Sequence, residues 1–354
     1  MNKPKLPVTL VIPHRNRLDH ITECVESVIQ MDELPAEILI IDDNSNDSVL
    51  GRMRDAFARY PVRIIALPEN IGRVNAKNLG ISLCKTGHIW FLDSDVTILF
   101  PNTLSYAFNL LKNRDEIAVA GGELIKGTDG LNYFAETKLL PNYESRFEYY
   151  PIDSTSPGEI VKYVRCIPTC NFLTETAVIK KAGGFHPFLI QGEDKLASLE
   201  IHKNKKLLIS SRCAVLHKRA HVPGQEKIIR RDSRRCNNFI YGASTSVMRI
   251  PFYYFDTALG MLMDFIFLRK RLHQLQLFSK SMQEDEPKNK DSIIRKILGV
   301  LSGSIALHFR RENIKSIIEG IEYRKEKKEF PSPLILRSIE KHARNYWSKK
   351  RCDS

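Results

Sequence analysis

The chain has 354 residues, of which 43% are hydrophobic and 27% charged, and this composition excludes a fibrous or wholly disordered protein. Its formal net charge of +13 is unevenly distributed, because residues 1–201 are mildly acidic and the basic excess lies entirely behind them. A basic region favours anionic partners such as membrane lipid, nucleic acid or a phosphorylated acceptor, and the alternative is a solvated basic face without a fixed partner.

The cysteines and the apolar segments bear on the cellular compartment. Cys166 and Cys170 have no second pair that would complete a zinc site, and the apolar run near the N-terminus does not fit a signal peptide. Residues 250–268 approach the length of a membrane-spanning helix, but Asp256 and Asp264 interrupt them, so they predict an interfacial or a buried helix. We therefore expect a cytoplasmic protein, with peripheral contact at the inner face of the plasma membrane as a further expectation.

The first hundred residues alternate strand-like apolar runs with helical patterns. The expected strands are at 8–13, 37–41, 62–67 and 88–92, and the helices between them are at 18–29, 48–60 and 71–84. Continuous apolar runs indicate strands that are buried on both faces, and the alternation predicts a parallel sheet with crossover helices. Ligands of such sheets bind at the carboxyl ends of the strands.

Beyond residue 100 the pattern is less regular. It predicts a helix at 101–112, a strand at 117–125, a Gly- and Pro-punctuated loop that meets the acceptor at 126–160, extended structure at 161–172, helices at 175–182 and from 193, and strands at 207–209 and 214–217. From about residue 224 the pattern is helical and rich in Lys and Arg. We expect an α/β domain at 1–223 and a helical, basic region at 224–354.

Polar and acidic residues follow three of the expected strands. The first strand ends in the basic stretch HRNR, the second ends at Asp42 and Asp43, and the fourth is followed by Asp93 and Asp95. Two carboxylates one residue apart at a strand end can both face a hard cation, and Mg²⁺ and Mn²⁺ take a few carboxylates together with phosphate oxygens and water. An Asp-x-Asp pair also occurs often by chance in solvated loops, so the pair alone does not define a site.

The chain resembles family 2 glycosyltransferases in four segments that occur in the order of that family: VTLVIPHRNRLDHITECVESVIQ, EILIIDDNSNDS, ENIGRVNAKNLGISLCKTGHIWFLDSDV and GGFHPFLIQGEDKLASLEIH. The resemblance covers about residues 7–220. It implies an α/β GT-A fold, with a Rossmann-like, mostly parallel central sheet flanked by helices, and here with a mainly helical C-terminal extension. It also implies metal-dependent, inverting transfer of a sugar from a nucleotide to an acceptor hydroxyl.

The resemblance assigns the nucleotide-sugar site. Asp43 corresponds to the residue that accepts a hydrogen bond from a uracil ring, which favours a UDP-sugar, and Asp42 either faces the ribose or supports the turn. Arg17 and Lys77 are expected at the diphosphate, where a solvated salt bridge is the alternative for each. Asn171 is either a donor to sugar hydroxyls or a structural residue. The other expected contacts are Pro13, Arg15, Asn70 and Asp93.

The implied cofactor is Mn²⁺ or Mg²⁺. The ligands that the resemblance implies are Asp93 and Asp95, with His217 as a further ligand, because imidazole suits manganese. His221 competes with His217 for that role, and either ring is alternatively a surface histidine. A cation held here would neutralise a departing diphosphate.

Asp194 is the candidate catalytic base, with Glu193 beside it. In an inverting transfer a carboxylate removes the acceptor proton while that oxygen attacks the anomeric carbon opposite the departing nucleotide. The alternative is a pair of acids that only interact with the dipole of the helix they begin. The segment RRDSRRCNNFIYG resembles the region behind the catalytic domain in bacterial members that act on lipid-linked or cell-envelope glycans.

Two other functions are weighed. A sugar-phosphate nucleotidyltransferase needs a Gly-rich loop after its first strand, and PHRNRLDH contains no glycine. A non-catalytic, basic, membrane-associated adaptor would tolerate loss of Asp93, Asp95 and Asp194, and all three are present. The expected partners are a nucleotide-sugar donor, a glycan, lipid-linked or other hydroxyl acceptor, and an anionic membrane. Nucleic acid is not expected, because the chain has no zinc-finger spacing or RNA-binding aromatic signature.

Overall fold

The computed structural model describes residues 3–126, 130–139, 145–152, 158–187, 189 and 192–218. The region expected at 224–354, the candidate ligand His221 and the apolar segment 250–268 lie outside these residues. Within the described part of the chain, no helix has the length and apolar character needed to cross a bilayer.

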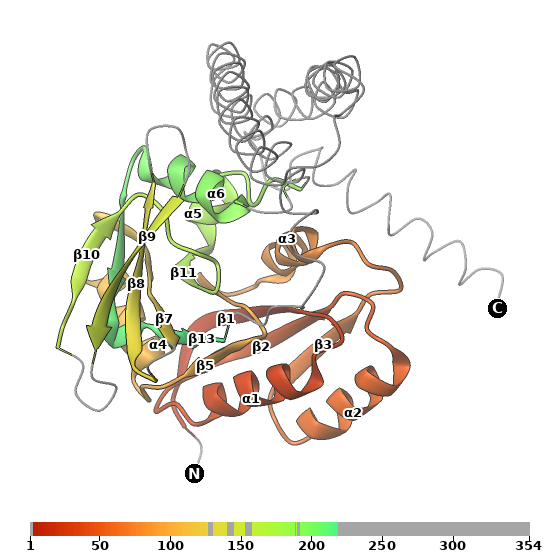
Figure 1. Cartoon of the computed structure of the whole chain (residues 1–354). Helices are drawn as coiled ribbons and strands as arrows, with labels where there is room; N and C mark the ends of the chain where they lie inside the picture. Colours follow the sequence, from red (N-terminus) through yellow and green to blue (C-terminus); the bar gives the residue numbers. More distant parts are fainter. Residues whose placement is uncertain are drawn as a thin grey trace, which may run out of the picture. The chain divides into compact units, whose positions relative to one another are not determined.

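The described residues form two sheets (Figure 1). The larger sheet contains eight strands: β1 (Lys5–His14), β2 (Leu34–Asp42), β3 (Val62–Ala66), β4 (His88–Leu92), β6 (Ile117–Gly121), β10 (Val161–Val164), β11 (Asn171–Glu175) and β12 (Lys206–Ser210). Its strand order is β10-β12-β6-β11-β4-β1-β2-β3. The smaller sheet contains five strands, in the order β5 (Val96–Ile98), β13 (Val215–His217), β7 (Glu123–Lys126), β8 (Asn132–Leu139) and β9 (Ser145–Ile152).

The expected parallel sheet is found in the N-terminal half. β4, β1, β2 and β3 lie parallel to one another, and the crossovers between them carry α1 (Leu18–Ile29), α2 (Asp47–Phe57) and α3 (Arg73–Leu83). Beyond β4 the sheet is mixed, because β11 lies antiparallel to both β4 and β6 and β10 lies antiparallel to β12. The α/β class with helices on both faces of a central sheet is therefore confirmed.

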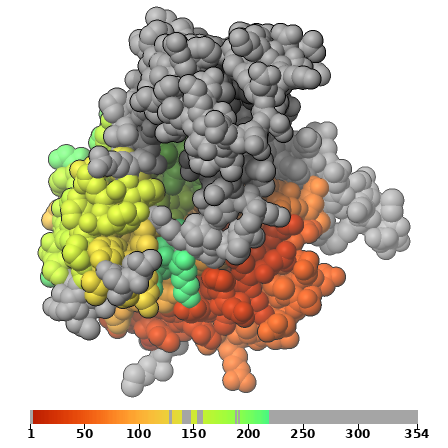
Figure 2. Space-filling model, viewed as in Figure 1, coloured from red at the N-terminus to blue at the C-terminus, as the bar shows by residue number. Residues whose placement is uncertain are grey.

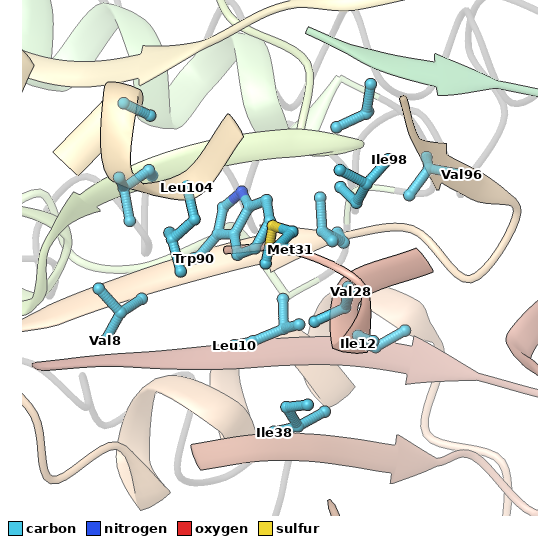
Figure 3. Close-up of a cluster of buried hydrophobic side chains, with 14 of the residues drawn as sticks. Val8, Leu10, Ile12, Val28, Met31, Ile38, Trp90, Val96, Ile98 and Leu104 are labelled. Atoms are coloured by element: carbon cyan, nitrogen blue, oxygen red, sulfur yellow. The ribbon is translucent and has the colours of Figure 1, made fainter. Parts of the chain in front are cut away.

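Two apolar clusters cover the two faces of the larger sheet. Successive side chains of a strand point to opposite faces, so Leu10 and Ile12 of β1 pack toward α1 whereas Val11 packs toward α3. Figure 3 shows Trp90 of β4 in the first cluster, near Leu10 and Met31. The helix α4 (Thr103–Lys112) adds to this first cluster, and α5 (Thr176–Lys181) and α6 (Glu193–His202) add to the second.

Two expectations for the middle of the chain are wrong. The stretch 126–160 is not a loop, because β8 and β9 pair antiparallel over eight residues each. Gly130 and Gly158 lie outside these two strands, whereas Pro151 lies within β9, opposite Tyr133 of β8. The single strand expected at 117–125 is two strands in different sheets, and they separate at Gly122, where a Cβ would come within 2.7 Å of the backbone oxygen of Ser210.

The contact between α3 and the sheet depends on a glycine. A Cβ on Gly80 would come within 2.4 Å of Cγ1 of Val11, a branched side chain fixed in the middle of β1. By contrast, Gly51 of α2 has no atom within 4 Å of the place where a Cβ would stand. Gly80 therefore allows α3 to lie directly against β1, whereas Gly51 has no such packing role.

The two helical glycines form a matched pair for a stability test. Gly80→Ala is expected to lower the free energy of unfolding by about 1–3 kcal/mol, because the added methyl overpacks the interface between α3 and β1. Gly51→Ala is expected to raise it by about 0.5–1 kcal/mol, because alanine loses less backbone entropy in a helix. Urea unfolding followed by circular dichroism measures both. A Gly80→Ala protein as stable as Gly51→Ala would contradict the close packing of α3.

Candidate active site

Asp42 and Asp43 at the end of β2 have separate structural roles. Asp42 is buried and accepts hydrogen bonds from the backbone N–H and the hydroxyl of Ser45, so it supports the turn. Asp43 accepts the backbone N–H groups of Ile71 at 2.6 Å and Gly72 at 3.0 Å, just before α3 begins. Burial raises the pKa of Asp43 above its ordinary value, although these two donors oppose the shift. Asp43 thus connects the end of β2 to the start of α3.

The turns that follow β1 and β2 hold each other in place. Asn16 and Asn44 adopt left-handed backbone conformations, with φ of 56° and 63°. The N–H of Asn16 donates to the hydroxyl of Ser45, and the side-chain oxygen of Asn16 accepts the N–H of Asn46, both at 2.8 Å. The carboxyl ends of both strands therefore present one connected polar edge.

The other residues expected at the nucleotide lie around this edge. Pro13 is buried within β1. Arg15 is exposed, and its charge opposes the rise in the pKa of Asp43 that burial causes. Arg17 is half-buried, with one guanidinium nitrogen 3.3 Å from a carboxylate oxygen of Asp95. The side chain of Asn70 accepts the backbone N–H two residues further along the chain, at 2.9 Å.

Asp93, Asp95 and His217 come together as a candidate cation site, with one possible ligand atom from each and all three atoms within 4.8 Å of one another. His217 arrives by the antiparallel pairing of β13 with β5, in which it stands opposite Val96. Its Nε2 lies 3.4 Å from Oδ1 of Asp95. In Figure 2 the green end of the described chain, which includes β13, surfaces beside the red N-terminal residues.

Glu123 and Cys170 extend this cluster through His217, and no sequence motif marks either of them as a ligand. Nδ1 of His217 lies 2.7 Å from Oε1 of Glu123, which orients Nε2 of the ring toward Asp95. Burial on its own would lower the pKa of His217, but Cys170, Asp95 and Glu123 together raise it. Two carboxylates and an oriented imidazole are a suitable donor set for Mn²⁺, so the residues fit the cation that the fold implies.

Lys77 lies beneath the site rather than on its surface. Its side chain is 1% exposed, and its Nζ lies 3.1 Å from Oε1 of Glu193 and 3.7 Å from Oδ1 of Asp93. It also donates to the hydroxyl of Thr169. Burial would lower the pKa of this ammonium, but the carboxylates of Glu193 and Asp93 raise it. In this structure the Lys77 ammonium therefore lies between two carboxylates, and its expected contact with a diphosphate stays a prediction.

Glu193 and Asp194 begin α6, directly after Gly192 in a left-handed conformation with φ of 83°. Glu193 is buried, and Lys77 and Arg73 hold its pKa below the usual value against the effect of burial. Burial and the neighbouring Glu193 carboxylate raise the pKa of Asp194 to about 6. Glu193 is thus ion-paired with Lys77 and Arg73, whereas Asp194 is the carboxylate of the two that suits proton transfer.

Asn171 has a structural role. It is 2% exposed, and its amide group donates to the backbone oxygens of Gly122 at 2.8 Å and Cys213 at 2.7 Å. Its oxygen accepts the indole N–H of Trp90 at 2.8 Å. Both N–H donors of the amide are therefore used inside the protein, which favours the structural alternative, and the contact with sugar hydroxyls stays a prediction.

Comparisons with known proteins agree with this fold. Residues 9–169 match the family model described as Glycosyl transferase family 2. The teichoic acid poly(glycerol phosphate) polymerase of Staphylococcus epidermidis is 27% identical over 188 residues, which are 51% of this chain and 23% of the polymerase. The glycosyltransferase GlyG of Streptococcus pneumoniae serotype 4 is 31% identical over 133 residues, which are 37% of this chain and 44% of GlyG. The chain thus spans less than half the length of these relatives.

A solved structure supports the same fold. GalNAc-T7 with UDP, GalNAc and Mn²⁺ superposes with a TM-score of 0.52 at 18% sequence identity, covering 66% of this chain and 47% of that one. The central sheet and the flanking helices of the present chain are therefore of the GT-A type. Residues 9–169 are thus similar to family 2 glycosyltransferases, and the described residues adopt a fold of the GT-A type.

Proposed function

We propose that the protein is a metal-dependent, inverting glycosyltransferase that moves a sugar from a UDP-sugar to an acceptor hydroxyl during synthesis of a cell-envelope polysaccharide or glycolipid. The observation that carries the proposal is the meeting of Asp93, Asp95 and His217 in one cluster, with Asp93 linked through Lys77 to the segment that holds Asp194. A cation site and a candidate base thereby belong to one connected site.

The donor side of the site suits a nucleoside diphosphate. Asp43 provides a buried carboxylate at the end of β2, where an imide N–H of a uracil ring would find an acceptor. Arg17 is half-exposed beside Asp95, where its guanidinium can reach a diphosphate oxygen. A divalent cation on Asp93, Asp95 and His217 would supply further positive charge to stabilise the diphosphate as it leaves.

The acceptor side depends on Asp194. An acceptor hydroxyl would lose its proton to this carboxylate while its oxygen forms the new bond to the anomeric carbon. The bond from that carbon to the diphosphate oxygen would break on the opposite side and release the nucleoside diphosphate. With a pKa of about 6, Asp194 is mostly ionised at neutral pH and still basic enough to accept the proton.

The cell-envelope assignment is supported by the printed names of relatives, which include a teichoic acid polymerase and a succinoglycan biosynthesis protein. A lipid-linked acceptor would suit the expected peripheral contact between the basic region 224–354 and an anionic membrane. The proposed location is the cytoplasmic face of that membrane.

Asp95→Asn tests the cation site. The substitution removes a carboxylate charge that faces His217 and Arg17, so it is expected to abolish Mn²⁺-dependent release of UDP from a UDP-sugar. Asp32→Asn, which changes an exposed acid outside the site, serves as the matched control and should retain wild-type turnover. Coupled-enzyme detection of UDP, with and without chelator, measures the effect. Unchanged wild-type activity in excess chelator would contradict the cation assignment.

Asp194→Asn tests the base. The variant is expected to bind UDP and Mn²⁺ normally and to lose transfer by roughly 100- to 10,000-fold, the usual range for a general base. Wild-type kcat should fall as the pH drops below about 6, because Asp194 then takes up a proton. The pH profile of the variant should lack this acidic decline in kcat. Glu200→Gln alters another acid of α6 and is the control. Near-normal turnover by Asp194→Asn would remove Asp194 from the role.

A further inference from the structure

Lys77 is held by a helix that is fixed at several points. Before the first turn of α3, two backbone N–H groups donate to Asp43. In the middle of the helix, the side chain of Asn78 donates to the backbone oxygen of Phe185 at 2.7 Å and accepts the N–H of the same residue at 2.9 Å. Two residues further on, Gly80 lies directly against β1. The backbone from which the Lys77 side chain extends is therefore held in a fixed position.

The partners of this ammonium come from opposite sides of the proposed reaction. Asp93 follows β4 and belongs to the cation cluster on the donor side. Glu193 begins α6 and directly precedes the candidate base Asp194. Thr169 and the ring of Phe185, whose centroid lies 5.8 Å from Nζ, complete the surroundings of the charge. With 1% of its side chain exposed, Lys77 offers almost no surface to a ligand.

We propose that Lys77 is a positioning residue that fixes the separation between the cation-binding Asp93 and the Glu193–Asp194 pair, and that it makes no contact with the diphosphate. The inference rests on the proposed function. Without the Lys77 ammonium, the buried carboxylate of Glu193 would keep only the ion pair with Arg73 at 3.7 Å. The Arg73 side chain is itself half-exposed. A buried carboxylate that loses its cation relaxes toward water or takes up a proton, and either change moves the first turn of α6, where Asp194 lies.

The test compares three variants of the full chain. Lys77→Met removes the charge at similar length, Lys77→Arg keeps it, and Lys203→Met removes an exposed ion pair with Glu200 at the other end of α6. The binding of UDP in the presence of Mn²⁺ is measured by calorimetry. The values of kcat and KM are measured on the UDP-sugar that the wild type turns over, and kcat is normalised to the folded fraction from thermal unfolding.

Lys77→Met is expected to lower kcat at least ~100-fold, the effect of displacing a reacting group by about 1 Å, while the Kd for UDP and the donor KM stay within threefold of wild type. Lys77→Arg should recover kcat to within about tenfold, and Lys203→Met should match wild type. If Lys77→Met does not fold, the double variant Lys77→Met, Glu193→Gln, which removes both buried charges, is measured instead and should fold but remain slow.

Three results would overturn the proposal. A rise in the Kd for UDP in step with the loss of kcat would make Lys77 a diphosphate ligand. A normalised kcat of Lys77→Met within threefold of wild type, or wild-type turnover in the double variant, would remove the positioning role. Absence of any turnover by the wild-type protein, across UDP-, GDP- and dTDP-sugars, would instead contradict the proposed function itself, so the two failures are distinguishable.

Discussion

A cation enclosed by protein must be neutralised by neighbouring groups, and this requirement organises the site around Lys77. Moving an ammonium out of water is costly unless carboxylates and hydrogen-bond acceptors surround it. Lys77 obtains these partners from the residue after β4, from the turn before β11 and from the start of α6, which are far apart in the sequence. The charge therefore has low energy only when α3, the end of β4 and the start of α6 are assembled together. The stability of the fold and the geometry of the site depend on the same contacts.

The N-terminal half could be predicted because its signals are local. Apolar runs of strand length alternate with amphipathic helices, and the parallel order of β4, β1, β2 and β3 follows from that alternation. Acids that follow such strands must lie at one edge of the sheet, which is where Asp43, Asp93 and Asp95 lie. The grouping of His217 with two of these acids was expected only from the family resemblance, since no pattern in the sequence reports the pairing of β13 with β5.

The remaining differences arise from long-range packing. Glu123 reaches His217 only because the chain leaves the larger sheet at Gly122 and enters the smaller one, and a pair of glycines does not reveal that change. Asn171 has the chemistry of a sugar contact, yet strand pairing encloses it between backbone oxygens. Lys77 has the charge of a diphosphate ligand, but the position of α3 turns it inward. In each case the residue type was informative about chemistry, and burial decided which partner it meets.

The order of these residues along the chain has a consequence for the assembly of the domain. The span that matches the family ends at residue 169, whereas Asp194 and His217 come later. A nascent polypeptide that has emerged only to that point contains Asp43, Asp93 and Asp95, but it lacks both the proposed proton acceptor and the imidazole. Its Lys77 also lacks Glu193. Vectorial synthesis therefore produces the acids at the strand ends first, and the proposed base and the imidazole follow between residues 170 and 218.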